Sequence, residues 1–258
     1  MKRDDVVLLT GGGGIIGRAM TAELTRVGHA VAVVDRDPDA ARVSADHASD
    51  GLASAYRCDV TSREHLVDLQ ERVGAEMGRV GALICNAATK SENFFAPFQE
   101  FPLDDWDEVM ATNLTGPMLC SQVFGASMAA DGNGSIINVL SVYGIVAPDQ
   151  RIYEGSEYEG RAINTPAVYS ASKAGLWGLT KYLASYWGDA GVRVNAITPG
   201  GVFSGQNDAF VEAYSNRTML GRMARAGEIA AAAAFLVSDG ASYITGQNIV
   251  VDGGLTSW

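Results

Sequence analysis

Short runs of apolar and β-branched residues recur along the chain, and amphipathic stretches separate them. The runs have the length and composition of buried strands. They cover Val6–Leu9, Ala30–Val34, Ala53–Tyr56, Ala82–Cys85, Ser135–Leu140, Arg193–Ile197 and Asn248–Val251. Between them, apolar positions spaced as on one face of a helix predict helices near residues 15–28, 38–48, 62–77, 104–129, 167–188 and 227–237.

Buried strands that alternate with helices predict a parallel sheet with helices on both faces. With right-handed crossovers, this becomes a doubly wound, Rossmann-type α/β fold of the kind that binds dinucleotides. The chain has 258 residues, enough to bury a full central sheet. No linker, repeat or low-complexity stretch interrupts the alternation, so we expect residues 1–258 to form a single domain.

The composition narrows the classes of partner. A net charge of −11, from 19 basic and 30 acidic residues, argues against binding to a phosphate backbone and so against nucleic acid. The three cysteines, Cys58, Cys85 and Cys120, are widely spaced without a C-x-x-C pair, which favours buried thiols in a reducing compartment. No histidine has a partner at metal-ligand spacing, so we predict no metal site. We see no signal peptide and no apolar run of membrane-spanning length, and we expect a cytoplasmic protein that does not enter a membrane.

A tyrosine and a lysine stand four residues apart in Tyr169-Ser170-Ala171-Ser172-Lys173, within a predicted helix. Their side chains should therefore leave from one face. An ammonium held about 4 Å from the phenol, at an effective dielectric of about 20, would favour the phenolate by about 4 kcal/mol. That would bring the pKa of Tyr169 from about 10 to near neutrality, where a general acid or base works best. Helices produce this spacing by chance, so the surrounding motifs decide its meaning.

A glycine-rich turn follows the first strand, in Thr10-Gly11-Gly12-Gly13-Gly14-Ile15-Ile16-Gly17-Arg18. Glycines at such a turn let the backbone approach a pyrophosphate, which the N-terminus of the next helix attracts. The spacing fits G-x-G-x-x-G at Gly12, Gly14 and Gly17. A P-loop is excluded, because Arg18-Ala19 stands where Lys-Ser/Thr would be needed.

Polar residues end the next three strands. Asp35 follows the second strand, where a carboxylate accepts hydrogen bonds from the adenosine ribose and repels a 2′-phosphate, which favours NAD(H) over NADP(H). The neighbouring Arg36 could instead pair with a 2′-phosphate, so NADP(H) stays open. Asp59 and Val60 follow the third strand and Asn86 the fourth, at the carboxyl edge where such sheets bind ligands.

Together and in this order, these motifs resemble the short-chain dehydrogenase/reductase family over nearly the whole chain. The resemblance implies hydride transfer with a nicotinamide cofactor. The glycine turn departs from the family's T-G-x-x-x-G-x-G, because Ile15 occupies the place of the middle glycine, and which glycine touches phosphate stays open. The cofactor-binding residues that the resemblance implies are Gly11, Gly13, Gly14, Ile16, Gly17, Asp35, Arg36, Asp59, Val60, Asn86, Tyr169, Lys173, Val202 and Ser204.

The same resemblance implies a catalytic set of four residues. Tyr169 would exchange a proton with the substrate, and Lys173 would tune it and hold the nicotinamide ribose. Ser141 would orient the reacting oxygen, and Asn113 would support a water link to Lys173. A nucleophilic role for Ser141 is disfavoured, because it has no G-x-S-x-G elbow and no histidine placed to activate it.

Tyr169 follows Ser141 by 28 residues, more than in most members of the family. The extra segment, residues 147–161, is polar, charged and aromatic, and it must start and end beside the two residues. We expect it to form an inserted substrate loop that becomes ordered when substrate binds, suited to a hydroxyl-rich or anionic molecule such as a sugar derivative. A solvated surface loop is the alternative. Together with residues 200–206, it also resembles oxidoreductases of bacterial nonulosonate and flagellin-sugar modification.

The sequence therefore predicts an NAD(P)-dependent oxidoreductase that interconverts a secondary alcohol and a ketone on a polar sugar or polyol-like substrate. One alternative is a sugar-nucleotide dehydratase or epimerase, for which the chain looks too short to hold a separate substrate domain. Another is a dinucleotide-binding scaffold without catalytic activity. The resemblance also implies a homo-oligomer, either a dimer or a tetramer.

Overall fold

A parallel sheet of seven strands runs through the centre of the computed structural model, which describes residues 5–158 and 160–258. The strand order is β3-β2-β1-β4-β5-β8-β9, so the order reverses between β1 and β4. The predicted doubly wound fold is therefore confirmed. The strands are β1 Val6–Thr10, β2 Ala30–Asp35, β3 Ala53–Arg57, β4 Val80–Cys85, β5 Gly134–Val139, β8 Val192–Pro199 and β9 Asn248–Val251.

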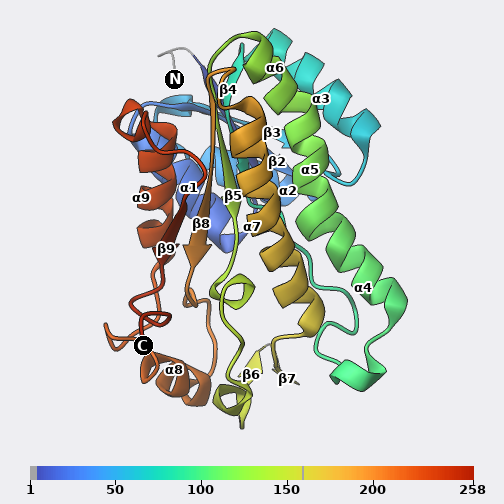
Figure 1. Cartoon of the computed structure of the whole chain (residues 1–258), viewed down its shortest axis with the longest axis vertical. Helices are drawn as coiled ribbons and strands as arrows, with labels where there is room; N and C mark the ends of the chain where they lie inside the picture. Colours follow the sequence, from blue (N-terminus) through green and yellow to red (C-terminus); the bar gives the residue numbers. More distant parts are fainter. Residues whose placement is uncertain (1–4, 159) are drawn as a thin grey trace.

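Helices cover both faces of the sheet, with α1 and α9 on one side and α5 and α7 on the other (Figure 1). Side chains alternate between the two cores: Val6 and Leu8 of β1 pack with α3 and α7, whereas Val7 and Leu9 pack with α1 and α9. Burial on both faces explains why the strands read as continuous apolar runs. The helices are α1 Ile15–Arg26, α2 Pro38–Asp46, α3 Arg63–Glu76, α4 Leu103–Met110, α5 Gly116–Cys120, α6 Ala126–Ala130, α7 Ala167–Trp187, α8 Asp208–Ser215 and α9 Ala226–Val237.

The long helix predicted at 104–129 is present, but two π-helical turns divide it into α4, α5 and α6. They cover Ala111–Thr115 and Ser121–Gly125. At the second turn, a side chain on Gly125 would overlap the ring of Trp187 in α7, so the two helices approach closely there. The first turn carries Asn113, and π-helical turns are often found at functional sites.

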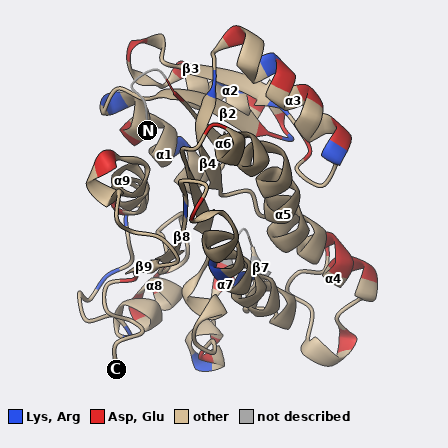
Figure 2. Cartoon of the chain, turned by 45° about the horizontal axis from the view of Figure 1, so that its top comes forward, with Lys and Arg blue, Asp and Glu red and all other residues tan. Residues whose placement is uncertain are grey.

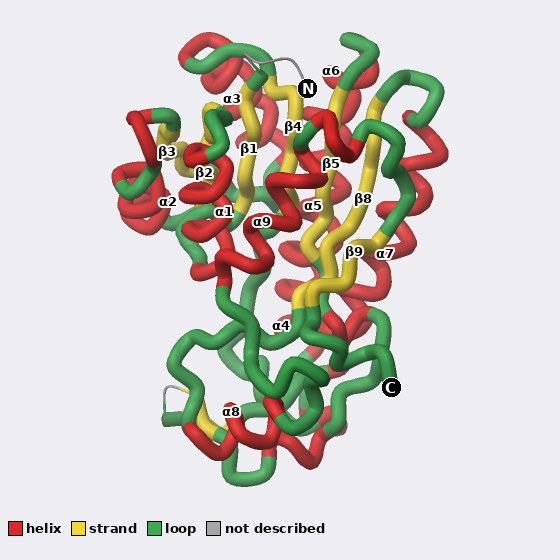
Figure 3. Tube along the Cα trace, turned by 90° about the vertical axis from the view of Figure 1, so that its left-hand side faces the viewer, coloured by secondary structure: helices red, strands yellow, loops and turns green. Residues whose placement is uncertain are grey.

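Beyond the carboxyl ends of the strands, loops and α8 form a separate layer (Figure 3). The layer includes a short antiparallel pair, β6 Glu157–Tyr158 and β7 Arg161–Ala162. It has its own apolar cluster, centred on Ile152, Phe210 and Tyr214. The segment after Ser141 is thus packed against α8.

Positions of charged residues recur along the outer helices, as the blue and red segments of α3 and α4 show in Figure 2. The three cysteines are buried and free, as the sequence predicted. Within residues 5–158 and 160–258, none of the helices has the length and apolar character needed to cross a membrane.

Candidate active site

Two adjoining cavities lie along the carboxyl edge of the sheet and share Ala88 and Thr89 in their walls. The larger, of about 450 Å³, is lined by Ser141 at the end of β5 and by Tyr169 in the first turn of α7. The smaller, of about 230 Å³, lies over the ends of β2 and β3. Such a crevice, beside the point where the strand order reverses, is where open α/β sheets bind ligands.

The glycine-rich turn connects β1 to α1 with very little space around it. Gly11 has a φ of 64°, and a side chain there would come within 2.7 Å of the Ala87 backbone. A side chain on Gly17 would lie 2.3 Å from the Gly11 carbonyl oxygen. Helix α1 begins at Ile15, and Gly14 at its N-cap offers no capping side chain. Ile15 and Ile16 of this first turn line the larger cavity, and amides at an uncapped helix N-terminus are suited to an anion.

The carboxylate of Asp35 is fixed beside this turn. Its Oδ2 accepts a hydrogen bond from the Gly13 amide at 3.0 Å, and its Oδ1 accepts one from the Asp37 amide at 3.1 Å. Asp35 and Arg36 both line the smaller cavity. A side chain on Gly13 would come within 3.0 Å of the Asp35 carboxylate, so glycine there allows this contact.

Asp59 and Val60 line the same cavity. Partial burial would raise the pKa of Asp59, but hydrogen bonds from the hydroxyl and the amide of Thr61 outweigh it and hold that pKa below its usual value. Arg36 adds a smaller electrostatic contribution in the same direction. Asp59 is thus kept ionised at the cavity wall.

Asn86 lines neither of the two cavities and instead supports the glycine turn. Its Nδ2 donates to the carbonyls of Thr10 at 3.2 Å and Gly11 at 2.9 Å. These bonds hold the end of β4 against the glycine turn. Asn86 therefore shapes the turn, whereas Ala88 and Thr89 after it form the wall.

Lys173 lies beneath Tyr169 and is almost fully buried. Its Nζ donates to the Val139 carbonyl oxygen at 2.7 Å and lies 5.9 Å from the centroid of the Tyr169 ring. On the other side, the Ser141 hydroxyl hydrogen-bonds the Tyr169 phenol and accepts from the Tyr143 amide at 3.3 Å. The structure thus brings Ser141, Tyr169 and Lys173 together, as the sequence predicted.

The structure contradicts the expected lowering of the Tyr169 pKa. Burial raises the pKa of Tyr169, and the hydrogen bond with Ser141 only partly opposes this. Burial also lowers the pKa of Lys173 to about 8, so its ammonium is itself disfavoured. The Coulomb argument from sequence omitted the cost of removing both groups from water, and that cost decides the direction.

Asn113 is fully buried in the first π-helical turn. Its Oδ1 accepts from the Thr89 amide at 3.1 Å, and its Nδ2 donates to the Ser172 hydroxyl at 3.3 Å. It therefore ties the cavity wall to the residue that precedes Lys173. The water link to Lys173 stays a prediction.

Val202 and Ser204 line the larger cavity after β8. Gln206, which the sequence pattern did not single out, supports them: its Oε1 accepts from the Ser204 amide at 2.8 Å, and its Nε2 donates to the Val202 carbonyl at 3.2 Å. A β-bridge between Val202 and Ala224 joins the two ends of the segment 203–223, an excursion from the sheet that contains α8. Two backbone hydrogen bonds, of 3.0 and 2.9 Å, form this closure.

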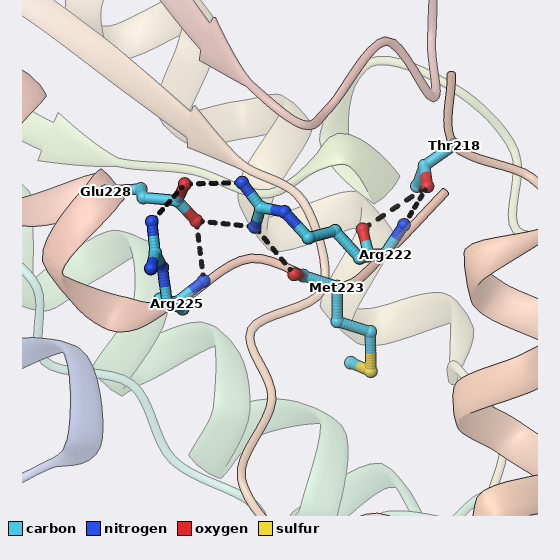
Figure 4. Close-up of polar contacts among 5 residues, drawn as sticks. All are labelled: Thr218, Arg222, Met223, Arg225 and Glu228. Atoms are coloured by element: carbon cyan, nitrogen blue, oxygen red, sulfur yellow. Dashed lines mark hydrogen bonds and ion pairs between the residues drawn. The ribbon is translucent and has the colours of Figure 1, made fainter. Parts of the chain in front are cut away.

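Met223 also lines the larger cavity, and a polar cluster holds its backbone (Figure 4). The Arg222 guanidinium donates to the Met223 carbonyl at 3.1 Å and forms a paired contact with Glu228 at 2.6 and 2.8 Å. The Arg222 bonds, with the Arg225 amide, lower the pKa of Glu228 to about 2. Thr218 completes the cluster by bonding the backbone of Arg222. Nothing in the sequence pattern signals this contact between a loop and α9.

The segment 147–161 does not line the larger cavity in its described part, whereas Tyr143 before it and Ile163–Pro166 after it do. Glu159 and the side chains of Tyr158 and Arg161 lie outside the described part. Tyr153 points inward: its hydroxyl bonds Tyr143 at 3.1 Å and Thr165 at 2.5 Å. Its ring stacks on Phe210 at 5.7 Å. The segment thus supports residues that form the wall.

Comparisons with known proteins agree with this geometry. A family model described as enoyl-(acyl carrier protein) reductase matches residues 14–256. D-threitol dehydrogenase of Mycolicibacterium smegmatis is 35% identical over 97% of this chain and 92% of its own. A short-chain dehydrogenase of Leptospira borgpetersenii, solved with bound NAD+, superposes with a TM-score of 0.85 at 32% identity, covering 98% of this chain and 93% of its own. A gluconate 5-dehydrogenase of Burkholderia cenocepacia, solved with NADP and tartrate, gives 0.85 at 29% identity, covering 98% and 96%.

The buried position of Lys173 predicts a pH-dependent effect on folding. Its folded-state pKa of about 8 lies below its ordinary value of 10.5, so the unfolded chain binds more protons between these two pH values. The burial penalty is complete below about pH 8 and is lost as the pH rises. Wild-type stability relative to Lys173→Met should therefore increase by up to about 3 kcal/mol across this window. Denaturant unfolding of both proteins at several pH values measures this difference in unfolding free energy.

The exposed Lys181 on the same helix gives the control, since Lys181→Met should show no such trend. A stability difference between wild type and Lys173→Met that does not change with pH would contradict the burial argument.

Proposed function

The chain belongs to the short-chain dehydrogenase/reductase family, and we propose that it interconverts a secondary alcohol and a ketone on a small polyol or sugar-like molecule, using a nicotinamide dinucleotide. The observation that carries the proposal is the hydrogen-bonded pair of Ser141 and Tyr169 on a cavity wall, with Lys173 buried behind it. These hydroxyls would face the oxygen of a bound alcohol or ketone.

The chain's own residues fit a dinucleotide. The Gly11–Gly17 turn and the start of α1 would take the pyrophosphate, because a side chain on Gly11 or Gly17 would overlap neighbouring backbone. Asp35 would bind the adenosine ribose, and the wall at Asp59 and Val60 would contact adenine. Val202 and Ser204 would hold the nicotinamide end at the larger cavity. When bound, the nicotinamide would accept a hydride from the carbinol carbon or return one to the ketone.

Tyr169 would move the proton. In oxidation, its phenolate would take the hydroxyl proton as the C–H hydride leaves; in reduction, its phenol would donate that proton to the oxygen of the ketone. Ser141 would orient this oxygen and, by lowering the pKa of Tyr169, would favour the phenolate. Lys173 would support the pair from behind and hold the ribose, and Asn113 would link α7 to a proton path.

The larger cavity suits a molecule of monosaccharide size. Its volume of about 450 Å³ lies within the usual range for small-molecule sites. Besides Ser141, Tyr169 and Ser204, the wall carries polar groups of Tyr143, Asn164, Thr165 and Gln206 among aliphatic and aromatic side chains. The likeness to D-threitol dehydrogenase over nearly the full length of both chains supports a polyol-like substrate and a one-domain dehydrogenase.

The first test of this mechanism is Tyr169→Phe. We expect kcat to fall by a factor of about 10² to 10⁴, because the proton carrier is lost, while the Kd for NADH stays nearly unchanged. Steady-state kinetics and NADH titration, run side by side, measure both. Tyr182→Phe, on the exposed face of the same helix, is the matched control. Retention of more than about a tenth of kcat in Tyr169→Phe would remove Tyr169 from the mechanism.

We propose NAD(H) as the preferred cofactor, on the basis of the fixed carboxylate of Asp35. Asp35→Ala should weaken NAD(H) about tenfold and reduce the discrimination against NADP(H), since a charged hydrogen-bond acceptor is lost. Asp35→Asn keeps an acceptor for the Gly13 amide and so separates loss of charge from loss of support. Values of kcat/KM for both cofactors decide the matter: a wild-type preference for NADP(H) would mean that Arg36 dominates this strand end.

We further propose that residues 147–161 act on the substrate through Tyr153. Tyr153→Phe would keep the stacking on Phe210 but lose the hydroxyl contacts to Tyr143 and Thr165. We expect KM for the substrate to rise several-fold while NADH affinity is unchanged. Arg151→Ala, at an 83% exposed side chain in the same segment, is the comparison. If Arg151→Ala raised KM as much, the segment would close over the substrate directly, as the sequence suggested.

A further inference from the structure

Tyr143 lines the larger cavity at a position that is fixed from two sides. Its amide donates to the Ser141 hydroxyl at 3.3 Å, which ties it to the residue proposed to hold the reacting oxygen. The next residue, Gly144, packs so closely on α7 that a side chain there would lie 2.8 Å from the backbone of Lys173. Tyr143 is therefore held in a defined position relative to Ser141 and Lys173.

A chain of three hydroxyls ends at Tyr143. The Tyr153 hydroxyl donates to the Tyr143 hydroxyl at 3.1 Å, and a hydrogen bond of 2.5 Å joins Tyr153 to the Thr165 hydroxyl. Since a phenol has a single proton, Tyr153 donates to Tyr143 and accepts from Thr165. The Tyr143 oxygen thus already accepts a hydrogen bond, and its own proton has no acceptor in the described part of the chain.

Two more hydroxyls of the cavity wall are in the same state. The Tyr214 hydroxyl accepts from the Gly201 amide, and the Ser204 hydroxyl accepts from Nε2 of Gln206 at 3.0 Å. Neither has an acceptor for its own proton among the described residues. The wall therefore offers a bound molecule several protons, which favours a ligand that carries more than one acceptor oxygen.

The proton of Tyr143 is a neutral donor. Burial raises the pKa of Tyr143, so its hydroxyl stays protonated at every working pH. Donors in a hydrogen-bonded chain strengthen one another, so the bond from the last hydroxyl gains from the two behind it. Because Tyr143 is itself bonded to Ser141, an oxygen that accepts this proton would lie close to the reacting carbon.

From this arrangement we infer that Tyr143 determines specificity by donating a hydrogen bond to a second oxygen of the substrate, while Ser141 and Tyr169 hold the oxygen that reacts. The substrate class is an alcohol with an oxygen on the neighbouring carbon, such as a vicinal diol, and its oxidised product is a hydroxy ketone. In the oxidation, a hydride leaves the reacting carbon for the nicotinamide and a proton leaves its hydroxyl for Tyr169. The second oxygen keeps its bonds and serves for binding alone. This inference deepens the proposed function and rests on it.

The test uses three ketones that differ only at the neighbouring carbon: butan-2-one, acetoin and butane-2,3-dione. Oxidation of NADH with each ketone gives kcat/KM for the wild type and for Tyr143→Phe. We expect Tyr143→Phe to lower the values for acetoin and butane-2,3-dione about tenfold, mainly through KM, because a hydrogen bond to the second oxygen is lost. The value for butan-2-one should stay nearly unchanged, since this ketone has no second oxygen. Comparison between the two proteins cancels the different intrinsic reactivities of the ketones.

Two further variants isolate the hydroxyl of Tyr143. Tyr56→Phe removes another buried phenol hydroxyl, which donates to Glu76 at 2.8 Å away from both cavities, and it should leave the three values in their wild-type proportions. In the Tyr143→Phe protein, the additional change Tyr153→Phe should have little effect on acetoin, because both residues act on one hydrogen bond. The Kd for NADH in Tyr143→Phe should equal that of the wild type, which separates substrate binding from cofactor binding.

The outcomes distinguish the inference from the function beneath it. An equal loss with all three ketones would give Tyr143 a structural role, and no loss with any of them would give it none; both results would overturn the inference and leave the proposed function standing. A loss with acetoin alone would mean that the second oxygen must donate rather than accept, and it would also overturn the role of Tyr143. Absence of turnover with the three ketones and with threitol would overturn the proposed function, and the inference would fall with it.

Discussion

The hydrogen bond from Lys173 to the carbonyl of Val139 joins α7 to the end of β5, and the geometry of the site depends on it. Ser141 lies two residues beyond that carbonyl, and Tyr169 lies one helical turn before the lysine. One contact therefore fixes the distance between the two hydroxyls. It is also a costly arrangement, because a lysine almost without exposure to water has its pKa lowered to about 8. The closely packed interior of a complete α/β sheet is what keeps this group in place.

Most of the fold was predictable, because its signals are local. Strands buried on both faces give continuous apolar runs, and the glycine turn follows from the close approach of backbone at Gly11 and Gly17. That Tyr169 and Lys173 lie together was predictable for a similar reason, since residues four apart on a helix share a face whatever surrounds them. Ser141 needed only the rule that ligands bind where parallel strands end.

What the sequence did not show depends on contacts between distant segments. Helix α8 has only eight residues and is stabilised by packing against the segment that contains Tyr153. The inward position of Tyr153 could not be read from a polar, charged stretch. At the second π-helical turn, Gly125 lies against the ring of Trp187, 62 residues later in the chain. The expected lowering of the Tyr169 pKa was wrong for the same reason, because desolvation is a property of the assembled structure.

The β-bridge between Val202 and Ala224 has a consequence for how the sequence of this enzyme could vary. Its two hydrogen bonds join backbone to backbone, so they do not depend on which side chains occupy the excursion between them. The side chains of the segment add their own contacts, since the Gly201 amide after β8 donates to the Tyr214 hydroxyl of α8. Within this segment, Phe210, Tyr214 and Met223 line the larger cavity, so changes there would reshape the cavity wall while the backbone bridge stays in place. A graft of this segment from a related chain would therefore join best at Val202 and Ala224, where the contacts are between backbone atoms.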